Sequence, residues 1–91
     1  MKELEKPLWT FLNGYFVSTN DTFDKGLETM VFPAENGART IESIFTVRVV
    51  GVDFEKPFEE FTRHYQTVEE AKKGHKDTVK VLRDKIRKEK K

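Results

Sequence analysis

The sequence contains no cysteine, so neither a disulfide framework nor a thiolate metal site can form. It has no apolar run near the ~18 residues that a membrane span needs. Its start, MKELEKPLW, has no apolar stretch of the kind found in signal peptides. We therefore expect a cytosolic protein that does not bind membranes.

The short motifs that organise most small catalytic or metal sites are also missing. There is no Ser or Cys nucleophile motif and no glycine-rich phosphate loop. The two histidines, His64 and His75, do not have the spacing of an HxxxH or HExxH zinc motif. Carboxylates are plentiful, but nothing in the sequence places two of them across a cleft. We expect no catalytic residues, no metal and no cofactor.

What the chain does have is one domain's worth of residues with many aromatic side chains. Its 91 residues are too few for a second core, so we expect a single domain over residues 1–91. Apolar residues make up only 36% of the chain, but eight Phe, two Tyr and one Trp each bury about 150–250 Å² in a core. This aromatic content favours a folded protein over a disordered one.

Apolar runs separated by turn residues predict an antiparallel sheet of four or five strands. Asn13-Gly14 is a favoured two-residue hairpin loop, and it would pair Phe11 with Phe16. A second Asn-Gly, at Asn36-Gly37, is expected to turn the chain from LETMVFP into TIESIFTVRVV. The expected strands cover approximately residues 8–12, 15–18, 27–32, 40–50 and 60–65.

One long helix is predicted over residues 68–88, beginning with a capping box formed by Thr67 and Glu70. His75 lies on the stripe of this helix that is otherwise apolar, and Gly74 precedes it. A glycine inside a helix costs about 1 kcal/mol relative to alanine, so we expect Gly74 to let the helix approach the sheet closely. We expect His75 to be structural, reaching into the sheet to bond a carbonyl or a side chain. The alternative role, a ligand or general base, would need converging partners.

The predicted fold is therefore α+β: a mainly antiparallel, four- or five-stranded meander with one long C-terminal helix packed on one face. Such an arrangement leaves the second face of the sheet without a covering helix. We predict that four residues form an exposed apolar surface for a protein partner. They are Phe16, Met30, Phe32 and Phe54.

Two stretches, GLETMVFPAENG and RHYQTVEEAKKGH, resemble a group of small uncharacterised proteins from tailed phages and prophages of Gram-positive bacteria. Members of this group share a strand like E-T-M-V-F, an acidic Asn-Gly turn, an aromatic residue, a Thr or Ser cap, E-E-A and G-H. The corresponding positions here are Glu28–Phe32, Pro33–Gly37, Tyr65, Thr67, Glu69–Ala71 and Gly74-His75. The resemblance covers about residues 27–80. It implies phage origin and a small α+β unit, and it supplies no catalytic residue.

The function that we predict is non-enzymatic protein–protein interaction in a phage or prophage. The partner would be a second copy of the chain, a virion component or a host protein that the chain modulates. Such proteins act through an exposed apolar surface rather than through a pocket.

A second hypothesis is nucleic-acid binding through the basic end of the helix. Residues 80–91 carry seven basic and two acidic side chains, which gives them a net charge of +5, whereas the whole chain has a net charge of +1. Bases would stack on Trp9, Phe11 and Tyr15 of an open sheet face, although the acidic body of the chain would repel phosphates. The candidate phosphate contacts are Lys80, Arg83, Lys85, Arg87 and Lys88.

Overall fold

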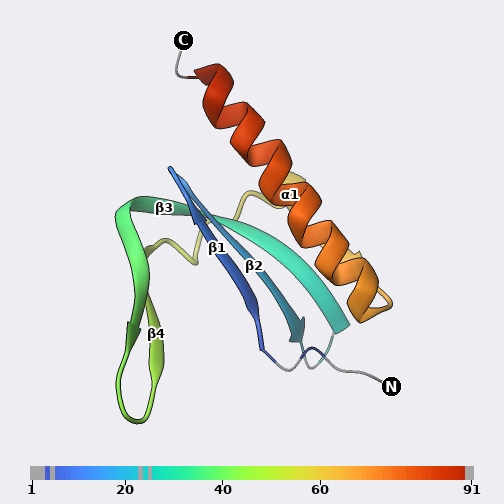
Figure 1. Ribbon diagram of the computed structural model, residues 1–91, viewed down its shortest axis with the longest axis horizontal. Helices are drawn as coiled ribbons and strands as arrows, with labels where there is room; N and C mark the ends of the chain where they lie inside the picture. The colour runs from blue at the N-terminus through green and yellow to red at the C-terminus, as the bar shows by residue number, and fades with distance from the viewer. Residues whose placement is uncertain (1–3, 5, 23, 25, 90–91) are drawn as a thin grey trace.

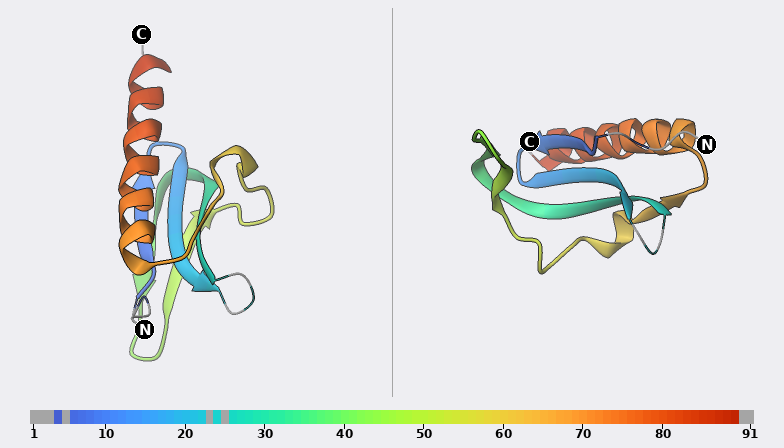
Figure 2. Two further views of the ribbon diagram at one scale, coloured as in Figure 1. Left: turned by 90° about the vertical axis from the view of Figure 1, so that its right-hand side faces the viewer. Right: turned by 90° about the horizontal axis from the view of Figure 1, so that it is seen from below.

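The computed structural model describes residues 4, 6–22, 24 and 26–89 (Figure 1). An antiparallel sheet in the order β1-β2-β3-β4, with β5 paired to the free side of β3, is covered on one face by a long helix, α1 (Figure 2). The predicted α+β meander with one C-terminal helix is confirmed. The elements are β1 (Leu8–Leu12), β2 (Tyr15–Thr22), β3 (Gly26–Glu42), β4 (Val47–Val52), a 3₁₀ turn (Glu59–Phe61), β5 (Arg63–Tyr65) and α1 (Val68–Glu89).

The first hairpin forms in the predicted register. Leu12 lies opposite Tyr15 and Phe11 lies opposite Phe16, with Asn13-Gly14 as the two-residue loop between them. Strand β2 is longer than expected because it continues through Thr22 and pairs with β3 over its whole length. Side chains alternate between the two faces along each strand, so this register decides which residues meet the helix.

The predicted turn at Asn36-Gly37 is wrong. Strand β3 runs without reversal from Gly26 to Glu42, and the register with β4 shifts between Ala34 and Arg39. Gly37 has a φ of 91°, which here lets the strand accommodate extra residues and bend instead of turning back. The reversal comes later, over residues 43–46, so the predicted strand over residues 40–50 is divided between the end of β3 and β4.

After the reversal, the chain runs back antiparallel to β3 and stays beside it along the length of β3. After β4, the Asp53 N–H donates to the Pro33 carbonyl (3.0 Å), and the Phe58 N–H donates to the Val31 carbonyl (2.8 Å). Strand β5 then pairs with the first residues of β3. The predicted last strand, over residues 60–65, is therefore a 3₁₀ turn followed by a short strand.

Helix α1 packs on the sheet face that carries Val17 and Val31, which meet Val79 and Leu82 of the helix. Thr67 caps the helix as predicted, because the Glu70 N–H donates to Thr67 Oγ1 at 3.1 Å, whereas the Glu70 carboxylate accepts from the Thr67 hydroxyl (3.1 Å) and not from its N–H as a full capping box would require. A second group of buried side chains, Leu27, Val68 and Ala71, fixes the N-terminal end of the helix on the sheet. These two groups of buried side chains lie between α1 and strands β2 and β3.

Candidate functional site

Two of the four residues predicted to form an exposed partner surface are buried. Phe16 is 1% exposed and Phe32 is 8% exposed, whereas Met30 is partly buried and Phe54 is 50% exposed. The Phe54 ring lies across Phe32 and Phe16, with centroid distances of 5.0 and 6.0 Å. The segment after β4 and the aromatic side chains of β1 cover the sheet face that faces away from the helix, so the surface predicted at Phe16 and Phe32 does not exist.

Among the described residues, the most exposed large apolar side chains lie elsewhere, at the end of the hairpin formed by β3 and β4. Ile44 is 92% exposed and Phe45 is 90% exposed, and Ile41 and Val47 beside them are 43% and 52% exposed. The hairpin extends away from the rest of the protein (Figure 1). We call residues 43–46 the hairpin tip. Sequence reasoning missed it because IFTV alternates like a strand, and Phe45 was expected to be part of a sheet.

The hairpin tip is held in one conformation by the residues that flank Ile44 and Phe45. The Ser43 N–H donates to the Thr46 carbonyl at 2.8 Å, and the Thr46 N–H donates to Ser43 Oγ at 3.2 Å. The Ser43 and Thr46 hydroxyls are also 2.9 Å apart. These bonds satisfy the backbone of the turn and leave both apolar side chains pointing outward.

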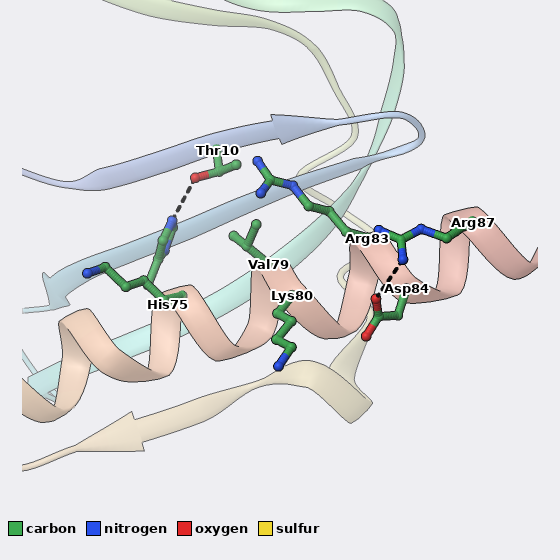
Figure 3. Close-up of a pocket in the computed structure, with 8 residues that line it drawn as sticks. Thr10, His75, Val79, Lys80, Arg83, Asp84 and Arg87 are labelled. Carbon is green, nitrogen blue, oxygen red and sulfur yellow. Dashed lines mark hydrogen bonds and ion pairs between the residues drawn. The ribbon is translucent and has the colours of Figure 1, made fainter.

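The five basic residues proposed for phosphate contact are all exposed, but they do not share one surface. Lys85 lies near Glu89 (3.9 Å), whereas Lys80, Arg83 and Arg87 face a groove of about 570 Å³ between α1 and β1 (Figure 3). Lys88 does not line this groove. Only Arg87 of the groove cations has an acid nearby among the described residues, with its Nη1 4.0 Å from the Asp84 carboxylate.

The aromatic side chains proposed to stack bases are not on the same side of the sheet as these cations. Trp9 and Phe11 pack against Phe16 on the opposite face. Tyr15 is on the helix side, but its ring packs against Phe58 at 5.3 Å. The structure therefore does not bring the cations and a stacking platform together.

His75 reaches from α1 into the sheet, as expected, and both of its ring nitrogens have partners. Nε2 is 2.8 Å from Thr10 Oγ1 and Nδ1 is 2.7 Å from Thr19 Oγ1. Thr19 contacts the Thr29 hydroxyl, which also accepts a hydrogen bond from the Tyr65 hydroxyl (3.0 Å). His75 is 7% exposed, and burial lowers its pKa below the usual value.

Either tautomer of the neutral imidazole can serve this chain, and one arrangement of protons is continuous from Tyr65 to Thr10. With the proton of the neutral imidazole on Nε2, Tyr65 donates to Thr29, Thr29 to Thr19, Thr19 to Nδ1, and Nε2 to Thr10. A second proton, on Nδ1, would point a donor at Thr19, and the Thr19 hydroxyl would then donate to Thr29 instead. Burial disfavours this charged form of the ring.

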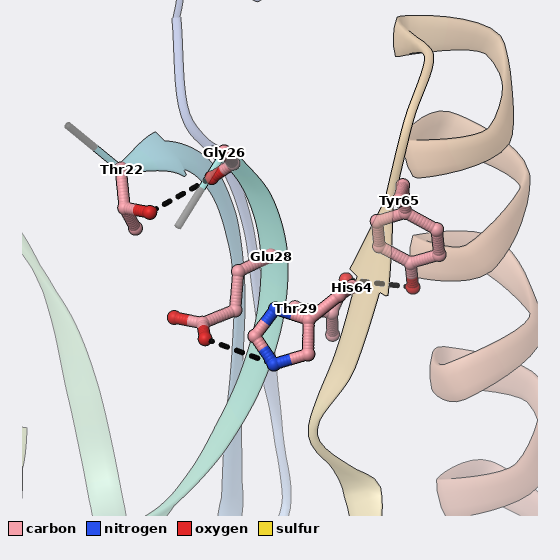
Figure 4. A network of polar contacts seen from close by, with 6 residues as sticks. All are labelled: Thr22, Gly26, Glu28, Thr29, His64 and Tyr65. Atoms are coloured by element: carbon pink, nitrogen blue, oxygen red, sulfur yellow. Dashed lines mark hydrogen bonds and ion pairs between the residues drawn. The ribbon is translucent and has the colours of Figure 1, made fainter. Parts of the chain in front are cut away.

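The second histidine lies in a different environment. His64 Nε2 is 3.5 Å from Oε2 of Glu28, a buried carboxylate on the neighbouring strand, while the Tyr65–Thr29 bond lies on the other face of the same strand pair (Figure 4). Across the described part of the chain, no three His, Cys, Asp or Glu side chains converge as metal ligands would. In the same residues, no helix is long and apolar enough to cross a membrane.

Comparison of the chain with protein-family models, with curated proteins and with solved structures finds no match. The function therefore has to be inferred from the chain's own residues and their contacts.

Proposed function

We propose that this chain is a small non-enzymatic protein of a phage or prophage that binds a protein partner through its hairpin tip. The observation that carries the proposal is the exposure of Ile44 and Phe45, at 92% and 90%. Burying a side chain of either kind stabilises a fold or a complex by about 1.5–3 kcal/mol. A partner that covers these two adjacent, solvent-exposed side chains would obtain stabilisation from the same burial.

The hydrogen bonding of the turn supports the same proposal. A flexible loop would lose conformational entropy on binding, but the hydrogen bonds between Ser43 and Thr46 already fix the hairpin tip. Ile41 and Val47 extend the apolar surface, while Glu42 and Arg48 are exposed beside it. An apolar centre with a charged rim is the usual composition of a transient protein interface.

The partner class follows from the phage resemblance of residues 27–80. A protein of this kind would bind either a virion component, as an accessory part, or a host protein in the bacterial cytoplasm. A surface of two aromatic or aliphatic anchors fits a partner that offers an apolar pocket of matching size.

The test first purifies the protein that the wild-type chain retains from phage-infected cells. Titration calorimetry then measures how tightly this protein binds the wild-type chain and its variants. Ile44→Ser/Phe45→Ser should weaken binding by more than about tenfold, because both anchors are lost. Val81→Ser is the matched control, because Val81 is also exposed (46%) but lies on the helix. Equal binding by the tip variant, or binding of the tip to lipid vesicles in place of a protein, would contradict the proposal.

A further inference from the structure

Strand β1 is an edge strand of the sheet. It pairs with β2 on one side, and among the described residues no strand pairs with its other side. Leu12 and Tyr15 flank a two-residue loop, so residues 8, 10 and 12 bond to β2. The N–H and C=O groups of Trp9 and Phe11 therefore point outward, away from the sheet. An exposed edge of this kind is a template for a further strand.

The groove beside this edge has a charged wall. It is lined only by Thr10 of β1 and by residues of α1, and β1 and α1 run in nearly the same direction along it (Figures 2 and 3). The cations on the helix wall are Lys76, Lys80, Arg83 and Arg87.

These four cations recur at steps of four and three residues, and Asp84 is the one acidic residue among the described residues that line the groove. Steps of four and three residues keep them on one side of the helix, and a step of four is ~6 Å along its axis. Of the four, only Arg87 has an acid within 4.0 Å in the described chain. Cations this close to one another repel, so a ligand that brings negative charge into the groove relieves their repulsion.

We propose that this groove binds an acidic peptide in extended conformation, which adds to the edge of β1 as a new strand. Its main chain would bond the outward groups of Trp9 and Phe11, as in other β-strand additions beside a helix. Every second side chain of a strand points the same way at intervals of about 6.7 Å, compared with axial steps of about 6 and 4.5 Å between successive cations, a difference that long Lys and Arg side chains can span. Alternate carboxylates would therefore meet Lys76, Lys80 and Arg83 in turn.

A single-stranded nucleic acid would fit the same cations less completely. Its phosphates would meet the helix wall, but its bases would find no aromatic surface, since Trp9 and Phe11 lie on the opposite face and Tyr15 packs against Phe58. It also offers no regular main-chain donors and acceptors for the β1 edge. The peptide satisfies both walls of the groove, and the groove is separate from the hairpin tip.

The test uses fluorescence anisotropy with a short fluorescein-labelled peptide in which glutamate alternates with threonine and valine. Lys80→Glu/Arg83→Glu should weaken its binding by about tenfold or more, because both cations of the groove wall are reversed. Lys73→Glu/Lys88→Glu makes the same change in net charge at exposed positions outside the groove, and should bind almost as well as the wild type. Circular dichroism confirms the fold of each variant, and the Gln versions replace any Glu variant that does not fold.

Two further ligands decide what kind of site the groove is. The same peptide with N-methylated amides keeps its charge but cannot pair as a strand, so it should lose binding. Equal binding by the methylated peptide would overturn strand addition, and equal binding by the two double variants would overturn the groove as the site. Tighter binding of fluorescein-labelled oligo(dT) than of the peptide would overturn the choice of ligand and favour nucleic acid.

Discussion

Gly74 of α1 lies directly on the ring of Tyr65, and a β-carbon at position 74 would overlap the hydroxyl and ring carbons of that tyrosine. The glycine therefore lets the helix approach β5 more closely than any other residue would allow. It also places His75 and Thr78 next to the sheet, with Thr78 donating to the Gly74 carbonyl at 2.8 Å.

Gly74→Ala should destabilise the protein, although alanine inside a helix is ordinarily about 1 kcal/mol better than glycine. The added methyl group cannot be accommodated without moving Tyr65 or the helix, and such overpacking costs about 1–3 kcal/mol. Urea unfolding measures the change, with Lys73→Ala at the exposed neighbouring position as the control. A more stable Gly74→Ala variant would show that the helix does not rest on Tyr65.

Stability should decrease in mild acid because of His75. Burial lowers the pKa of His75 in the folded state, so the unfolded state binds more protons in this range. The contribution is complete above the unfolded pKa of about 6.5 and is lost as pH falls below it towards the folded pKa. Within the described residues the ring bonds the hydroxyls of Thr10 and Thr19 alone, and the cation Lys76 follows it on the helix.

The measurement is the free energy of unfolding as a function of pH between neutral and mildly acidic solution. His75→Gln should be less stable at neutral pH but should lose most of the dependence on pH below 6.5, because a glutamine side chain does not titrate. His64→Gln, at the exposed histidine, should keep that dependence. If His75→Gln retains the wild-type slope, another group is responsible.

Thr19 should be as important to stability as an apolar core residue. It is fully buried and connects His75 to Thr29, so Thr19→Val leaves a buried ring nitrogen and a buried hydroxyl without their partner. An unsatisfied buried polar group costs about 1–3 kcal/mol. Thermal unfolding of Thr19→Val beside Thr40→Val, at a partly buried position in the hairpin, measures the difference. Equal stability of the two variants would contradict the hydrogen-bonded chain.

Phe32 and Phe45 should respond in opposite ways to the same substitution. Phe32→Ala opens a cavity among Phe16 and Phe54 and should cost about 3–5 kcal/mol. Phe45→Ala should change stability by less than about 0.5 kcal/mol, because its side chain is almost entirely in solvent. The two unfolding curves together test whether the aromatic core and the exposed tip are assigned correctly.

The sequence correctly predicted the features that depend on residues close together in the chain. The loop at Asn13-Gly14, the cap at Thr67 and the helical stripe through His75 are local patterns, and each appears where it was predicted. The role of Asn36-Gly37 was ambiguous from the sequence. A residue pair that favours positive φ occurs in bulges within a strand as well as in turns.

The location of the exposed apolar surface depended on contacts between distant residues. Phe16 and Phe32 are buried by Phe54, which the chain brings back only after the second hairpin. No local pattern distinguishes Phe45 at a hairpin tip from a phenylalanine in a strand. The return path of residues 47–65 along β3 covers the sheet face and leaves the hairpin tip exposed.

The most direct test of the central claim places a photo-crosslinking benzoylphenylalanine at position 45, and at position 81 as the control, in chain produced during phage infection. Phe45 is 90% exposed and resembles the probe in size and shape, so the fold should be unaffected. The account predicts one defined protein adduct from position 45 that is absent from position 81. The same adducts from both positions, or crosslinking only to lipid, would contradict it.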